Sequence, residues 1–378
     1  MNSQTCIRCL MDTSDPGITF NAEGICHYCV EADRELPKYR FTPQQESDNL
    51  HTIAETIKKE STGKYNAIIG LSGGVDSSYV THLAKKLELN PLIVHFDNGW
   101  NSEKSVSNIK KIIDKCGFHL ETYVINWPEF RDLQRSFFKA GVVDIEILSD
   151  HAIMATMFKL RKKHNIKFVL SGANYCTEHG MPNSWLWRKQ DLTNIKSIQK
   201  IFGTKSLKEF PKMSTIEFQL MKLLNWGGVY LEPLDKINYS KKIAISTLQD
   251  EYGWEYYGGK HYESVFTKFY QAYVLPTKFG FDKRKVHLSA LLRNGEISLT
   301  QAQKEIAAPA YNPAELKIEK NYVLKKLGFS ESEFNQIMNE TPKSHLAYNS
   351  DEWMFTAWRE STPTFIKKMV KKIIKKKV

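Results

Sequence analysis

The chain has 378 residues, of which 42% are hydrophobic and 25% are charged. This balance is typical of a globular protein and excludes a disordered or fibrous chain. The net charge of +11 does not by itself indicate nucleic-acid binding, because residues 365–378 carry seven lysines and no acid, which leaves +4 for the remainder. The sequence contains neither an apolar signal segment nor the roughly 20 apolar residues of a membrane span, so we expect a cytoplasmic protein.

Residues 1–35 contain two pairs of cysteines with C-x-x-C spacing. These cysteines are Cys6, Cys9, Cys26 and Cys29. Each pair can bind one edge of a zinc ion with Zn–S distances of about 2.3 Å, and two pairs complete a tetrahedron without an open position. The spacing therefore predicts a structural zinc ribbon, with His27 as a weaker alternative ligand. Cys116 and Cys176 are interpreted as small buried apolar side chains.

Residues 36–60 are predicted to form a linker, polar from 37 to 47, and a first helix. From residue 61 to residue 182, short β-branched or aromatic runs alternate with stretches of helical periodicity. The runs predict strands at 66–71, 91–96, 120–125 and 167–170. The stretches predict helices at 76–87, 102–116 and 150–164. This order predicts an α/β fold with a doubly wound parallel sheet, whose ligands gather at the C-terminal ends of the strands.

Residues 183–364 are predicted to form a mainly helical region that faces the substrate. Its first part is rich in aromatic residues, and residues 297–338 have a helical pattern with N-cap motifs at Thr300 and Ser330. The basic tail at 365–378 has apolar residues at helical spacing. It would either pack on the protein by one face or lie on an anionic membrane surface.

The stretch Ser72-Gly73-Gly74-Val75-Asp76-Ser77-Ser78 connects the strand predicted at 66–71 to the helix predicted at 76–87. Backbone N–H groups and a helix N-terminus converge there, and the serine hydroxyls add hydrogen bonds, so the expected ligand is an oligophosphate. The stretch lacks the lysine of a Walker motif and the spacing of a dinucleotide-binding fingerprint. It closely resembles the SGGxDS loop of the PP-loop ATP pyrophosphatases, which split ATP between the α- and β-phosphates and adenylate a substrate.

Polar residues at other strand ends are candidates for binding the nucleotide. Asp97 follows the second predicted strand, where its carboxylate could hold Mg²⁺ on the phosphates or complete a turn. Asp76 could bind the same metal ion, or stabilise the first turn of the helix through the helix dipole. The likeness to PP-loop enzymes assigns nucleotide contacts to Gly172 and Asn174, after the fourth predicted strand.

The cysteine pairs, the loop at 72–78 and two later segments together resemble the N-acetyl sugar amidotransferases. The later segments are GGKHYESVFTKFYQ at 258–271 and FDKRKVHLSALLRNGEIS at 281–298. The resemblance spans residue 6 to about residue 302. It implies a fold of the adenine nucleotide alpha hydrolase type with a zinc ribbon. It also implies an enzyme that converts the acetamido group of a nucleotide-linked sugar to an acetamidino group during synthesis of bacterial surface glycans such as the LPS O-antigen.

The implied reaction begins with attack of the amide oxygen on the α-phosphorus of ATP, with Mg²⁺ offsetting charge on the departing pyrophosphate. Ammonia then displaces AMP from the adenylated imidate. Candidate catalytic residues are Asp76, Lys260, His261 and Glu263. Candidate anion-binding residues for the substrate are Arg284, Lys285 and His287. Aromatic stacking on the substrate or core packing would each explain Trp185 and Trp187 beside Arg188.

No glutaminase motif is evident, because neither Cys116 nor Cys176 lies in a nucleophile turn. The resemblance implies a separate glutaminase subunit with a cyclase-like partner that delivers ammonia. The main alternative is a tRNA-modifying PP-loop sulfur transferase, but such enzymes generally need two cysteines near ATP. A non-catalytic RNA- or membrane-binding protein is a further alternative, and it leaves the loop at 72–78 unexplained. A nucleic-acid partner is therefore not expected.

Overall fold

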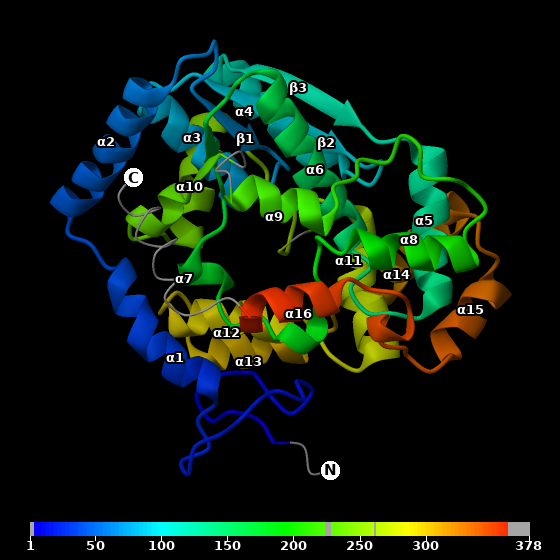
Figure 1. Cartoon of the computed structure of the whole chain (residues 1–378). Coiled ribbons are helices and arrows are strands. Elements are labelled where there is room, and N and C mark those ends of the chain that lie inside the picture. The colour runs from blue at the N-terminus through cyan, green and yellow to red at the C-terminus, as the bar shows by residue number, and fades with distance from the viewer. Residues whose placement is uncertain (1–3, 224–227, 261, 362–378) are drawn as a thin grey trace.

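The computed structural model describes residues 4–223, 228–260 and 262–361. At its centre lies a sheet of five parallel strands in the order β3-β2-β1-β4-β5 (Figure 1). The strands are β1 (Ala67–Gly70), β2 (Pro91–Asp97), β3 (His119–Val124), β4 (Phe168–Leu170) and β5 (Val229–Leu231). The predicted parallel α/β fold is confirmed. The edge strand β5 was not predicted, because three residues are too few to show a period.

The chain order of the strands places the site. After β1 the chain continues to β2 on one side of it, and β4 pairs with β1 on the other side. The strand order therefore reverses between β1 and β4, and the C-terminal ends of these two strands form the crevice in which doubly wound sheets bind ligands.

Helices cover both faces of the sheet. Those that follow the first three strands are α3 (Val75–Lys86), α4 (Glu103–Cys116), α5 (Trp127–Ala140) and α6 (Ile147–Lys163). In β1, Ile69 packs in the core formed with α3 and α4, whereas Ile68 points to the opposite face, where it packs near Leu160 of α6. This alternation follows from the two-residue period of a strand. The helices predicted at 76–87, 102–116 and 150–164 are confirmed within three residues at each end.

The N-terminal part consists of loops and three helical segments. These are α1 (His27–Glu35), η1 (Leu36–Tyr39) and α2 (Pro43–Glu60). The linker is shorter than its polar composition indicated. Thr42 and Gln45 form a capping box, so α2 begins inside the stretch 37–47.

The remainder is mainly helical, as predicted. Its elements are α7 (Tyr175–Glu178), η2 (Asn183–Trp185), α8 (Leu192–Phe202), α9 (Thr215–Leu223), η3 (Pro233–Lys236), α10 (Lys241–Tyr252), α11 (Val265–Phe269), the π-helix η4 (Tyr270–Phe279), α12 (Arg284–Arg293), α13 (Leu299–Ala307), α14 (Pro313–Leu327), α15 (Glu331–Asn339), η5 (His345–Ala347) and α16 (Glu352–Ser361). Ser330 caps α15 as predicted. The prediction for Thr300 was wrong: Ser298 caps α13, because its hydroxyl accepts from the N–H of Gln301 in a capping box.

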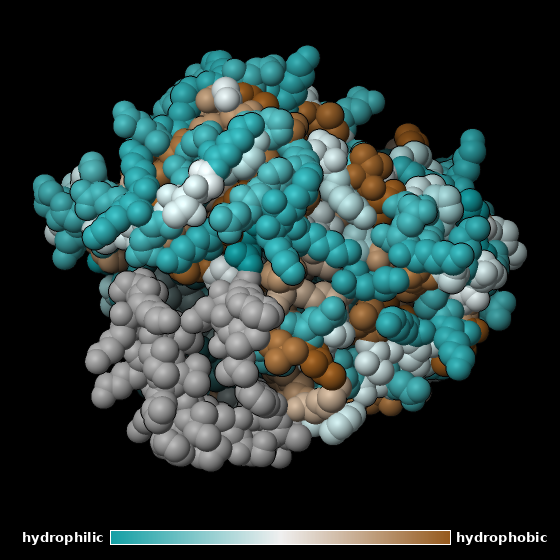
Figure 2. Space-filling model, turned by 45° about the horizontal axis from the view of Figure 1, so that its top comes forward, coloured by the Kyte–Doolittle hydropathy of each residue, from teal (hydrophilic) through white to brown (hydrophobic). Residues whose placement is uncertain are grey.

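Hydrophilic residues cover most of the face drawn in Figure 2, with apolar residues between them, as is usual for a globular surface. No helix among the described residues is long and apolar enough to cross a membrane. The basic tail at 365–378 lies outside the described residues, so its two predicted roles stay predictions.

Candidate active site

The loop between β1 and α3 has a backbone that requires glycine. Gly73 has a φ of +81°, and a Cβ there would lie 2.6 Å from the carbonyl oxygen of Ser105 in α4. Gly74 is the N-cap of α3 and offers no side chain to its first turn. The positive end of the helix dipole therefore faces the crevice without a capping side chain, which suits an anionic ligand.

Hydrogen bonds within the loop fix its shape. The Oγ atoms of Ser72 and Ser77 lie 3.2 Å apart, and Gly74 N donates to Ser72 Oγ at 3.1 Å. From outside the loop, Trp254 Nε1 donates to Gly73 O at 3.1 Å. The loop is thus fixed by its own serine side chains and by Trp254, so its N–H groups are oriented before any ligand binds.

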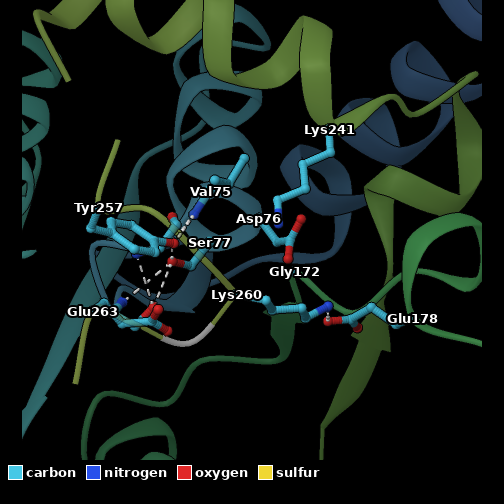
Figure 3. Close-up of a pocket in the computed structure, with 11 residues that line it drawn as sticks. Val75, Asp76, Ser77, Gly172, Glu178, Lys241, Tyr257, Lys260 and Glu263 are labelled. Atoms are coloured by element: carbon cyan, nitrogen blue, oxygen red, sulfur yellow. Dashed lines mark hydrogen bonds and ion pairs between the residues drawn. The ribbon is translucent and has the colours of Figure 1, made fainter. Parts of the chain in front are cut away.

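A cavity of about 180 Å³ opens against this loop (Figure 3). It is lined by Ser72, Gly74, Val75, Asp76, Ser77, Gly172, Glu178, Lys241, Tyr257, Lys260 and Glu263. Seven of these residues were predicted as site residues from the sequence, and the structure brings them together from three separate segments. Gly172 lies two residues after the end of β4. A Cβ on it would lie 3.0 Å from Ser77 N, so a side chain there would press on the start of α3.

Two lysines of the cavity differ in their electrostatic environment. Lys260 Nζ donates to Glu178 Oε1 at 2.7 Å, and its side chain is only 12% exposed. Burial opposes the charge, but the carboxylates of Glu178 and Asp76 outweigh it and raise the pKa of Lys260. For Lys241, burial and the nearby charge of Lys260 lower the pKa. In Figure 3 the side chain of Lys241 points toward Asp76, and that of Lys260 points toward Glu178.

Asp76 is the carboxylate within the phosphate loop. Burial raises its pKa, although the charge of Lys260 acts in the opposite direction. The hydroxyl of Tyr239 donates to Asp76 Oδ1. Mg²⁺ prefers oxygen ligands such as carboxylates, and a nearby cation would stabilise the charged form of this buried carboxylate. Asp76 is therefore the residue that would hold this ion.

Other predicted nucleotide contacts do not line the cavity, and Asp97 and Asn174 have structural partners. Asp97 Oδ1 accepts from Gly99 N at 2.8 Å and from Asn101 Nδ2 at 3.1 Å, which is the turn alternative. Asn174 caps α7, since its Oδ1 accepts from Thr177 N at 2.8 Å. Ser78 is fully buried within α3. His261 lies outside the described residues.

The residues predicted to bind the substrate anion lie in α12, and none of them lines the cavity. Arg284 pairs with Asp282 at 2.7 Å and donates to Ala308 O at 2.9 Å. Lys285 pairs with Asp12 of the N-terminal part. His287 is on the same helix, half-buried. The side chains of Arg284 and Lys285 thus bind neighbouring helix and loop segments.

Aromatic residues proposed to stack on the substrate pack in the core instead. Trp185 is buried and stacks on Phe281 with ring centroids 4.4 Å apart. Trp187 stacks on His345 at 4.6 Å. Arg188 pairs with Asp351 and Glu352, and packs over the ring of Phe355. The core alternative therefore describes these side chains.

The four paired cysteines form one cluster, separate from the cavity. All four Sγ atoms lie within 4.8 Å of one another, with Cys6 and Cys29 at 3.9 Å and Cys9 and Cys26 at 3.6 Å. A tetrahedral zinc ion with Zn–S distances of about 2.3 Å separates its sulfur ligands by about 3.8 Å. The donor set and its spacing therefore fit zinc. His27 Nδ1 accepts from Thr19 N at 3.1 Å, which gives this side chain a different partner.

Lys241, Glu178 and Tyr257 were missed by the sequence analysis. Lys241 opens α10 directly after its N-cap Ser240, and Glu178 closes α7. Neither stands in a motif. The available signal was positional: Glu178 follows the glycine-containing end of β4, in the stretch that already contained Gly172.

Comparisons with known proteins match two parts of the chain to family models. Residues 47–176 match the NAD synthase model, and residues 263–360 match the model described as LPS biosynthesis protein WbpG-like, C-terminal domain. An uncharacterised protein of Methanocaldococcus jannaschii is 23% identical over 240 residues, which are 63% of this chain and 79% of that protein. One subunit of the glutamine-hydrolysing GMP synthase of Archaeoglobus fulgidus is 33% identical over 133 residues, which are 33% of this chain and 39% of that protein.

Two solved structures are similar at low sequence identity. The NMN synthetase of Francisella tularensis is 18% identical, with 57% of this chain and 94% of that chain covered and a TM-score of 0.31. The NH₃-dependent NAD synthetase of Campylobacter jejuni is 14% identical, with 80% of this chain and 99% of that chain covered and a TM-score of 0.32. From the two family matches, the chain joins a PP-loop domain of the NAD synthase type to a WbpG-like C-terminal domain, and it is an ATP-dependent C–N ligase or amidotransferase of LPS biosynthesis.

Proposed function

We propose that the protein converts the acetamido group of a nucleotide-linked sugar to an acetamidino group, through an adenylated imidate and with ammonia as the nitrogen donor. The observation that carries the proposal is the cavity at the N-terminus of α3, where Lys241 and Lys260 converge on the phosphate loop. The match of residues 263–360 to a domain of LPS biosynthesis proteins supports a sugar as the substrate.

The cavity supplies what adenylation requires. The amide oxygen of the sugar forms a bond to the α-phosphorus of ATP, and the bond from that phosphorus to the β-phosphate oxygen breaks. Negative charge builds on the departing pyrophosphate, opposite the N-terminus of α3 and the two lysines. Mg²⁺, when bound at Asp76, adds a further positive charge at the same place. Glu178 holds Lys260 by its 2.7 Å ion pair, so one cation is in position before ATP arrives.

The second step forms the amidine. Ammonia attacks the imidate carbon, the carbon–oxygen bond to AMP breaks, and a proton leaves the attacking nitrogen. AMP carries away the oxygen of the original acetamido group. The carboxylate of Glu263 lines the same cavity and is the candidate to accept this proton.

An external source of ammonia is part of the proposal. Cys176 is buried and burial raises the pKa of its thiol, so it is a poor nucleophile; burial also raises the pKa of Cys116. The four other cysteines belong to the zinc cluster. A separate glutaminase with a cyclase-like partner would supply ammonia. The relative from Archaeoglobus fulgidus is named as one subunit of a glutamine-hydrolysing enzyme. The same cysteines disfavour sulfur transfer to tRNA.

Isotope transfer tests the proposal directly. The protein is incubated with ATP, Mg²⁺, ammonium and a nucleotide-linked N-acetyl sugar whose acetyl oxygen is ¹⁸O. The expected products are AMP that contains ¹⁸O, pyrophosphate, and a sugar in which NH replaces oxygen, all read by mass spectrometry. Formation of ADP and phosphate, or of AMP without the label, would contradict adenylation of the acetamido oxygen.

Neighbouring lysines offer a matched pair of variants. Lys241 lines the cavity, whereas Lys242 is exposed one residue later in the same helix. Lys241→Met should lower kcat/KM for ATP by about 10²-fold, because it removes a charge that faces the pyrophosphate. Lys242→Met should leave kcat/KM within about twofold of wild type. Equal values for the two variants would exclude Lys241 from the reaction.

A further inference from the structure

The guanidinium of Arg293, at the end of α12, is buried without a polar partner. Its Nε, Nη1 and Nη2 atoms are all enclosed, and none makes a hydrogen bond to another described residue. Nor does any ion pair join it to a carboxylate in the described ranges. Enclosing an unpaired guanidinium is costly, since an isolated charge loses its hydration and regains nothing. A compensating negative charge is therefore expected beside it.

The surroundings of Arg293 bring it to the cysteine cluster. The guanidinium lies over the ring of Tyr28, 6.0 Å from the ring centroid, and Tyr28 directly precedes the ligand Cys29. On its other side is Gly180, with a φ of +86° and a position where a Cβ would lie 2.6 Å from Nη1. Helix α12 also reaches the cluster through Ser289, whose Oγ accepts from Leu10 N at 3.0 Å, next to the ligand Cys9.

Other acidic or basic groups nearby do not provide the missing charge. Asp15 is buried in the same region, but no ion pair joins it to Arg293, and its oxygens accept from Tyr28 Oη at 2.7 Å and Ser184 Oγ at 2.8 Å. His179 Nδ1 donates to Tyr175 O at 2.8 Å. Burial and then the charge of Arg293 lower the pKa of His179 to about 4, so this ring is neutral at physiological pH.

We propose that Arg293 is the positioning partner of the zinc–cysteine cluster, which it neutralises from outside the coordination sphere. Four thiolates outweigh the charge of Zn²⁺, so the loaded cluster is negative, and its charge attracts the guanidinium. Zinc loading thereby gives Arg293 a countercharge, which no ion pair with a described residue supplies.

The pairing also fastens the N-terminal part to the rest of the protein. Helix α12 packs against both α1 and α7 (Figure 1). A second contact lies close by, where Arg40 donates to Asn294 Oδ1 at 2.8 Å, next to Arg293 in sequence. Glu178, which holds Lys260 in the cavity, is the last residue of α7. The zinc cluster, α12 and the wall of the active site thus form one continuous packed unit.

Zinc release from the full-length protein measures the pairing. Zinc transfer to an excess of a chromophoric chelator is followed by absorbance. Arg293→Met should release zinc about 10 to 100 times faster than wild type, as found for lost outer partners of metal ligands. Arg293→Lys keeps the charge but loses the planar guanidinium, so its rate of zinc release should lie between those of wild type and Arg293→Met. The control is Arg8→Met: Arg8 is also near the cluster, but it is 43% exposed and pairs with Asp33, so its loss should change the rate little.

Cobalt substitution gives a readout that simple loosening of the fold would not produce. The sulfur-to-cobalt charge-transfer band should shift in Arg293→Met and keep its wild-type position in Arg8→Met, because the enclosed charge of Arg293 acts on the ligand sulfurs, whereas the side chain of Arg8 is exposed and paired with Asp33. Wild-type zinc release in Arg293→Met, equal release in both Met variants, or an unshifted band would each overturn the proposal.

A glycine pair tests the same contact if Arg293→Met does not fold. Gly180→Ala inserts a methyl group where Nη1 lies, at a φ of +86°. Gly117→Ala has a similar backbone cost at a φ of +71°, but its Cβ would meet open space. Faster zinc release in Gly180→Ala alone would support the proposal. Equal release in the two variants would overturn it.

Discussion

Replacement of Gly73 by alanine would test whether the geometry of the phosphate loop controls the reaction. The new Cβ would lie 2.6 Å from Ser105 O, whereas ordinary contact begins at 3.4 Å, so the two segments must separate by about 0.8 Å. Ser105 is fully buried, and its N and Oγ both bond to Ser102. Helix α4 is therefore held in place, and we expect the loop to move.

The expected loss of activity follows from that displacement. A shift of this size in groups that position reactants costs roughly 10²-fold in kcat/KM. The left-handed backbone adds about 1–2 kcal/mol of lost stability. Gly253→Ala isolates this second effect, because Gly253 has a φ of +64° and open space at its Cβ. The assays are AMP release at varied ATP and unfolding in urea. If Gly73→Ala and Gly253→Ala had the same kcat/KM, the steric reasoning would be refuted.

Stability should depend on pH through His151, whose Nδ1 lies 2.6 Å from Lys189 O and whose Nε2 accepts from Met213 N. Burial lowers the pKa of His151 below 6.5. The neutral ring therefore stabilises the fold above that pH, and this contribution is lost as the pH falls. The unfolding free energies of wild type and His151→Gln should converge on acidification, and a constant difference between them would contradict this reasoning. Ser330→Ala removes the capping box of α15 and should cost about 1 kcal/mol in urea with turnover unchanged. Removal of zinc by a chelator should lower the melting temperature, and an unchanged melting temperature would argue against a structural metal.

The phosphate loop could be predicted because its information is local. Seven consecutive residues join a strand to a helix, and the glycine that needs a positive φ stands inside them. Gly172 could be predicted for a related reason, since parallel strands end at one edge of the sheet and β4 pairs with β1 there. The cysteine cluster likewise followed from the spacing within two short segments.

The rest of the cavity could not be predicted, because it depends on contacts between distant segments. Lys241 is one of 53 lysines and arginines, and only the packing of α10 against α3 brings it to the loop. The ion pair of Lys285 could not be predicted for the same reason. Its partner, Asp12, is 273 residues away, and nothing in either local sequence indicated the pair.

We expect the two lysines of the cavity to contribute differently to the binding of ATP. Lys260 is already paired with Glu178, so a bound triphosphate must compete with a carboxylate for it. The side chain of Lys241 makes no hydrogen bond or ion pair with another described residue, and burial lowers its pKa. Negative charge that arrives with ATP therefore stabilises the protonated form of Lys241 more than that of Lys260. Since the pyrophosphate gains further charge as it departs, an unpaired cation strengthens its contact during the reaction, and that is the interaction that accelerates a chemical step.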